Sequence, residues 1–115
     1  DENTQLKLGN GYEHCWVLDN YNKQLRKVAE LYSNETSIKM EVYTDLPGIQ
    51  LYTGNFLDGS LNSKKGKKYV NRSGLCLETQ FFPNSPNNQS FPSTILEPGI
   101  KFASRTSFKF TTFKK

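Results

Sequence analysis

The sequence contains few of the residues from which metal sites and disulfide frameworks are built. Its 115 residues include one histidine and two cysteines, Cys15 and Cys76. One histidine and two distant cysteines do not supply a zinc site, and a single pair of cysteines does not make a disulfide framework. There is also no glycine-rich loop of the kind that holds phosphates. We therefore expect neither a metal nor a cofactor.

Long hydrophobic runs are also absent. No apolar stretch approaches the roughly 20 residues that a helix needs to cross a bilayer, and the acidic, polar start (DEN) is unlike a secretory signal peptide. Both cysteines lie in apolar, strand-like segments, where a free thiol behaves as a small hydrophobe. Three Asn-x-Ser/Thr sequons do not establish secretion, because Asn-rich sequences contain them by chance. We expect a cytoplasmic protein with no membrane partner.

Excess positive charge is concentrated in two short stretches. The net charge is +4, and much of it comes from residues 64–68 (KKGKK) and from the final two lysines. Serine, asparagine and glycine surround the first stretch, which is typical of a solvated loop tip. A basic cluster can bind phosphates, but this setting does not favour it, so we expect no nucleic-acid partner.

Aromatic residues and alternating patterns indicate one small β-domain. Aromatics make up 13% of the chain, and their large buried areas can compensate for few aliphatic side chains. Apolar and polar residues alternate with the period of a half-buried strand. We predict strands at residues 14–18 (buried), 38–43, 49–53 and 75–81, from about residue 100, and at 106–110. Residues 1–13 are polar and are expected to form a loop, and four prolines between residues 83 and 98 predict irregular chain.

Residues 25–32 are ambiguous. Leu25, Val28, Leu31 and Tyr32 recur at helical spacing, and good helix formers lie between them. Taken alone, this pattern favours a short helix.

One carboxylate stands in an apolar context. Glu78 follows the apolar segment 74–77 (GLCL) and precedes Phe81 and Phe82, without an adjacent lysine or arginine. An apolar strand would reduce the solvation of this carboxylate and raise its pKa. The alternative is a strand glutamate that faces water at a sheet edge.

Three segments together resemble the galactose mutarotase (aldose 1-epimerase) family. They are residues 11–18 (GYEHCWVL), 47–57 (PGIQLYTGNFL) and 73–93, with the core CLETQ and a continuation into residues 94–99. The resemblance implies an all-β fold, part of an antiparallel β-supersandwich, and a strand rather than a helix at residues 25–32. Family chains are much longer, so it implies that residues 1–115 are the C-terminal portion of a single mutarotase-like domain, with the remainder of the chain as a partner.

The same resemblance implies an isomerase that interconverts the α and β anomers of a free hexose, such as galactose or glucose, by acid/base ring opening. It assigns Glu78 as the general base and Gln50 as an amide that hydrogen-bonds sugar hydroxyls. Glu13 stands where the family usually has an aspartate that holds a sugar hydroxyl, and its extra methylene makes the carboxylate reach further. A catalytically inactive sugar-binding or regulatory relative is the alternative.

His14 is not expected to be the general acid. In extended chain its side chain points away from the face of Glu13, and the acid of the family is a histidine in an earlier part of the chain. The resemblance therefore implies that these 115 residues alone are inactive.

Overall fold

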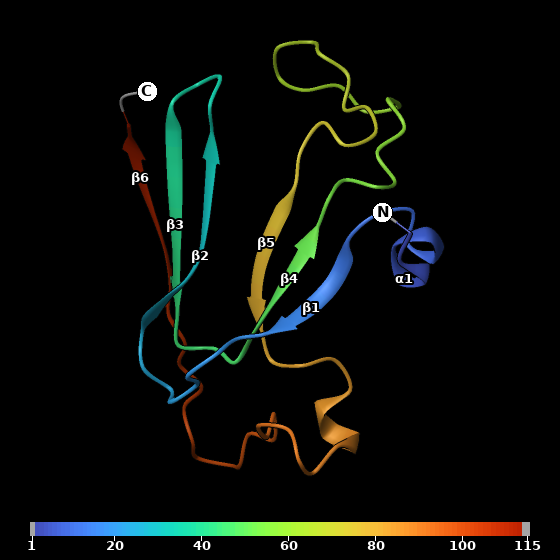
Figure 1. The fold of residues 1–115 in the computed structure, drawn as a ribbon. Helices are drawn as coiled ribbons and strands as arrows, with labels where there is room; N and C mark the ends of the chain where they lie inside the picture. The colour runs from blue at the N-terminus through green and yellow to red at the C-terminus, as the bar shows by residue number, and fades with distance from the viewer. Residues whose placement is uncertain (1, 114–115) are drawn as a thin grey trace. The chain divides into compact units, whose positions relative to one another are not determined.

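A computed structural model describes residues 2–113, and the elements in them are almost all β-strands. Two sheets of three strands each are formed, with strand orders β1-β4-β5 and β2-β3-β6 (Figure 1). The elements are α1 (Thr4–Leu8), β1 (Glu13–Val17), β2 (Arg26–Ser33), β3 (Ile38–Thr44), β4 (Gly48–Tyr52), β5 (Cys76–Gln80), the 3-10 helix η1 (Ser85–Asn87) and β6 (Thr106–Thr112). Neighbouring strands run antiparallel, so the predicted all-β class is confirmed.

The chain divides into two compact units, which are described separately. The first contains residues 2–16 and 49–78, with α1 and most of the β1-β4-β5 sheet. The second contains residues 17–48 and 79–113, with the β2-β3-β6 sheet. Among residues 2–113, no helix has the length and hydrophobicity that a membrane span requires.

The β2-β3-β6 sheet has one apolar and one charged face. In β3, Val42 lies opposite Ala29 of β2 and Phe108 of β6, and Glu41 lies opposite Glu30 and Lys109. Because successive side chains of a strand point to opposite faces, this register separates the two kinds of residue. The apolar face carries Leu31, Ile38, Met40, Val42, Phe108 and Phe110.

Residues 25–32 are extended, and the helix that their spacing favours when taken alone does not form. Arg26–Ser33 pair along β3, and a register shift between Lys27 and Ala29 marks a β-bulge at Val28. The bulge adds one residue to the strand, so the alternation changes phase in the middle of the segment. This change of phase produces the helix-like spacing, and the pairing with β3 confirms the strand that the family resemblance implied.

Three other expectations need correction. The helix α1 forms within the polar start because Asn3 caps it, its side chain accepting a hydrogen bond from the Gln5 amide at 2.9 Å. No strand begins near Ile100, since Gly99 turns the chain with φ 80° and the Ile100 amide donates to the Glu97 carbonyl at 3.1 Å. A strand forms at β1 as predicted, but it is not buried as predicted. Trp16 and Val17 are exposed, because β1 lies at an edge of its sheet.

Few apolar side chains are fully buried within the described residues. Val42 and Ile49 are buried, whereas Ile38, Phe108 and Phe110 are 46%, 49% and 65% exposed. Apolar residues of this size are usually buried in folded domains. The β2-β3-β6 sheet therefore presents much of its apolar face to solvent in this structure.

A cluster of charges surrounds Glu41 on the other face of the same sheet. Its carboxylate lies 3.1 Å from Lys27 Nζ, 3.3 Å from Lys109 Nζ and 3.7 Å from Lys39 Nζ. The residue is only 8% exposed. The hydrogen bond from Lys27, followed by the one from Lys109, lowers the pKa of Glu41 to about 2.

This cluster predicts how stability depends on pH. Because the folded-state pKa of Glu41 lies below its ordinary 4.5, the carboxylate stabilises the fold above about pH 4.5, and this contribution is lost as the pH falls through about 2. We expect Glu41→Gln to lower the urea midpoint at pH 7. Between pH 4.5 and 2, the stability of this variant should fall less than that of the wild type. Glu35→Gln, an equal charge change at an exposed turn residue, is the control. Identical pH profiles for the two variants would contradict the assignment.

Candidate functional site

The three residues assigned from the sequence lie on three neighbouring strands of one sheet. Glu13 is the first residue of β1, Gln50 is the third residue of β4, and Glu78 is the third residue of β5. In the strand order β1-β4-β5, the strand that carries Gln50 lies between the strands that carry Glu13 and Glu78 (Figure 1). Segments far apart in the sequence are thus brought together by the sheet.

Backbone hydrogen bonds show how β1 is aligned with β4. The Thr53 amide donates to the Tyr12 carbonyl at 3.0 Å, and the Leu18 amide donates to the Pro47 carbonyl at 3.0 Å. Five residues lie between these pairs on each strand, so the ladder has no net bulge and Glu13 is opposite Tyr52. Residues directly opposite share a face, and Tyr52 shares its face with Gln50. Glu13 and Gln50 therefore project from the same face of the sheet.

The chain that follows β4 lies close to the chain that precedes β5. A Cβ built on Gly54 would lie 2.6 Å from the Gly74 carbonyl oxygen, so the two backbones meet there. This close approach agrees with the order of the sheet, in which β5 is a neighbour of β4.

The environment of Glu78 differs from the apolar one that its sequence neighbours suggest. Its residue is exposed, and Glu13 is exposed as well. The reason is the strand order, since β1 and β5 are the outer strands of this three-stranded sheet. Within residues 2–113, no lysine or arginine forms an ion pair with either carboxylate. The expected loss of solvation at Glu78 is therefore not seen here.

His14 has contacts that suit a structural role. Its Nδ1 accepts a hydrogen bond from the Glu13 amide at 3.1 Å, and its ring packs edge-on against Tyr12 with 6.1 Å between ring centres. These contacts orient the imidazole along the start of β1. That His14 is not the general acid stays a prediction.

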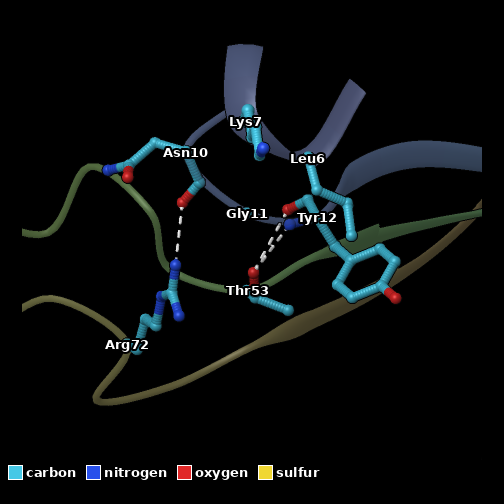
Figure 2. A pocket seen from close by; sticks show the side chains of 7 residues that line it. All are labelled: Leu6, Lys7, Asn10, Gly11, Tyr12, Thr53 and Arg72. Carbon is cyan, nitrogen blue, oxygen red and sulfur yellow. Dashed lines mark hydrogen bonds between the residues drawn. The ribbon is translucent and has the colours of Figure 1, made fainter. Parts of the chain in front are cut away.

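A hollow of about 420 Å³ lies in the first unit, and the assigned residues are not part of it (Figure 2). Tyr12 and Thr53 belong to its wall, and because side chains alternate along β1, Tyr12 points away from the face that carries Glu13. Its lining is formed by Leu6, Lys7, Asn10, Gly11, Tyr12, Thr53 and Arg72. A smaller hollow beside His14 and Trp16 does not include Glu13, Gln50 or Glu78 either.

The structure also reveals residues that sequence reasoning missed. Asn55 is 3% exposed, and its side chain joins the end of β4 to the chain just before Glu13. The Gly54–Asn55 pair looks like ordinary turn chemistry in the sequence, and nothing in it indicates a partner more than 40 residues away. Among residues 2–113, no group of three or more His, Cys, Asp or Glu side chains could hold a metal ion.

The sequence is similar to known proteins over most of its length. Residues 1–109 match the aldose 1-epimerase family. The chain is 43% identical to galactose mutarotase from Bos taurus over 89% of its length, and 34% identical to aldose 1-epimerase from Escherichia coli K12 over 87%. It spans only 30% and 29% of those two proteins.

A solved structure shows the same fold. The GalM/aldose epimerase homologue from C. elegans superposes with a TM-score of 0.73 over 90% of this chain and 30% of the homologue, at 24% sequence identity. This likeness supports the antiparallel β-architecture. Together with the match over residues 1–109, it leads to one conclusion: the chain belongs to the aldose 1-epimerase family.

Proposed function

We propose that this chain supplies the general base and two sugar contacts of an aldose 1-epimerase that acts on a free hexose such as galactose or glucose. The observation that supports the proposal is that Glu13, Gln50 and Glu78 lie on three adjacent strands of the β1-β4-β5 sheet. Two carboxylates and an amide can hold a hydroxyl-rich ligand, since carboxylates accept hydrogen bonds and an amide both donates and accepts them.

The chemistry assigns a separate task to each group. Glu78 takes the proton from the anomeric hydroxyl as the bond between the anomeric carbon and the ring oxygen breaks, and the anomeric carbon becomes a carbonyl. An acid gives a proton to the ring oxygen in the same step. Rotation exposes the other face of the carbonyl, and the reverse transfers close the ring as the other anomer. No proton is gained or lost overall.

Gln50 and Glu13 position the sugar in this scheme. Gln50 is half-buried on the central strand, and its amide is suited to bind a sugar hydroxyl. Glu13 accepts a hydrogen bond from another hydroxyl on the same face. Its extra methylene, relative to the aspartate usual in the family, makes the placement of its backbone important, because an error of about 1 Å can cost about a hundredfold in rate.

The general acid is proposed to lie outside these 115 residues. The chain spans about three tenths of the length of the galactose mutarotases that it matches. We propose that it corresponds to the C-terminal portion of the family domain, that the remainder of the domain supplies the acid, and that the protein is cytoplasmic.

Polarimetry tests the proposal directly. Freshly dissolved α-galactose or α-glucose is mixed with the native polypeptide that carries these residues, and the change in optical rotation is followed against buffer alone. We expect faster anomerisation than in buffer with the native polypeptide, and no acceleration over buffer with residues 1–115 alone. A native polypeptide that binds the sugar, detected by ligand NMR, but does not speed anomerisation would support the inactive relative instead.

A further inference from the structure

A buried amide connects the end of β4 to the segment that leads into β1. The Asn55 side-chain nitrogen donates to the Gly9 carbonyl at 3.1 Å and to the Tyr12 carbonyl at 2.9 Å. Its Oδ1 accepts from the Thr53 hydroxyl at 2.6 Å. All donors and the acceptor of the amide are therefore used within one small network, at a residue that is 3% exposed.

Thr53 completes this network at the backbone of Tyr12. Its Oγ1 accepts a hydrogen bond from the Tyr12 amide at 3.1 Å (Figure 2). Its own amide donates to the Tyr12 carbonyl at 3.0 Å. Both backbone polar groups of Tyr12 are thus held by Thr53 and Asn55. Tyr12 directly precedes Glu13, so a single peptide unit separates the network from the candidate sugar contact.

The place of Glu13 makes such support necessary. It is the first residue of β1, which lies at an edge of its sheet and so has a strand partner on one side only. Strand ends and edges open more easily than central strands. The network adds side-chain hydrogen bonds between the start of β1 and the chain that follows β4.

We propose that Thr53 and Asn55 are positioning residues for the candidate sugar contact Glu13. Acting through the backbone of Tyr12, they set where the Glu13 carboxylate stands on the face that it shares with Gln50. The inference rests on the proposed function for its role in catalysis, but the physical link itself can be tested without it.

Two substitutions at one position separate the hydroxyl from the shape of the side chain. Thr53→Val keeps the shape and removes the hydroxyl, which leaves the Tyr12 amide and Asn55 Oδ1 without this partner, whereas Thr53→Ser keeps the hydroxyl. For the native polypeptide we expect Thr53→Val to lower kcat/KM for mutarotation by about 10- to 100-fold through misplacement of Glu13. The kcat/KM of Thr53→Ser should stay close to that of the wild type. Equal losses in the two variants would overturn the proposal.

A double-mutant cycle shows whether the effect passes through Glu13. If it does, the double variant Thr53→Val with Glu13→Gln loses little more kcat/KM than Glu13→Gln alone. The losses of unfolding free energy of the two single variants, by contrast, should add in the double variant. If the loss of kcat/KM in the double variant equals the product of the losses in the two single variants, Thr53 acts independently of Glu13. The positioning role would then be wrong.

Hydrogen exchange gives a readout that does not depend on activity. We expect the Tyr12 and Glu13 amides to exchange faster in Thr53→Val than in Thr53→Ser, while amides of β3 remain unchanged. Unchanged protection at Tyr12 would overturn the proposal even in an active enzyme. A wild-type protein that does not accelerate anomerisation would remove the proposed function, and the exchange result would still decide whether Thr53 holds the start of β1.

Discussion

Glu78→Gln is expected to reduce the kcat of mutarotation by about 10²- to 10⁴-fold, the range that a positioned general base contributes. Glutamine keeps the size and the hydrogen-bonding reach of the side chain but cannot take the proton of the anomeric hydroxyl at neutral pH. Because the sugar can still bind, KM should change much less than kcat. The measurement is polarimetry with α-galactose over a range of sugar concentrations, using the native polypeptide.

A second glutamate provides the control for this prediction. Glu97→Gln makes the same charge change at an exposed residue of the second unit and should leave the rate unchanged. Thermal unfolding should show both variants folded, since Glu78 is exposed and forms no ion pair within residues 2–113. A Glu78→Gln protein that keeps most of its kcat would exclude this residue as the base.

Gly11→Ala is expected to destabilise the fold by about 2–5 kcal/mol, from backbone strain and overpacking together. Gly11 has φ +135°, a conformation that residues with a side chain rarely adopt. A Cβ at this position would lie 2.2 Å from Asn55 Oδ1 and 3.0 Å from Thr53 Oγ1. The methyl group can be accommodated only by displacing the network that holds Tyr12.

Chemical denaturation of Gly11→Ala and Gly66→Ala separates these two causes. Gly66 also has a positive φ, +74°, but no atom lies within 4 Å of the position of its Cβ. Gly66→Ala should therefore lower the free energy of unfolding by only about 1–2 kcal/mol, the cost of placing a residue with a side chain in the left-handed conformation. Equal losses for both variants would mean that contact with Asn55 does not contribute. We also expect Gly11→Ala to lower mutarotation in the fraction that remains folded, because the start of β1 has moved.

The candidate functional residues could be proposed from the sequence, but their arrangement on the sheet could not. Glu78, Gln50 and Glu13 were identified by motifs that resemble a family, and each motif is a local pattern. That these residues meet depends on the pairing of β4 with both β1 and β5, in which β4 and β5 are more than 20 residues apart. The exposure of Glu78 was also not predictable, since its neighbours in sequence are apolar but its strand lies at a sheet edge.

What the sequence alone determined about this protein is its local extended structure. Residues 38–43 and 106–110 alternate with period two and form β3 and β6, because alternation places one set of side chains on each face whatever the partner strand is. At residues 26–33 the family resemblance already implied a strand, and only the tertiary structure revealed its bulge. Only the tertiary structure also showed that Asn55 and Thr53 hold the chain before Glu13. The physical reason is that these features depend on hydrogen bonds between segments distant in sequence, which no local pattern of side chains encodes.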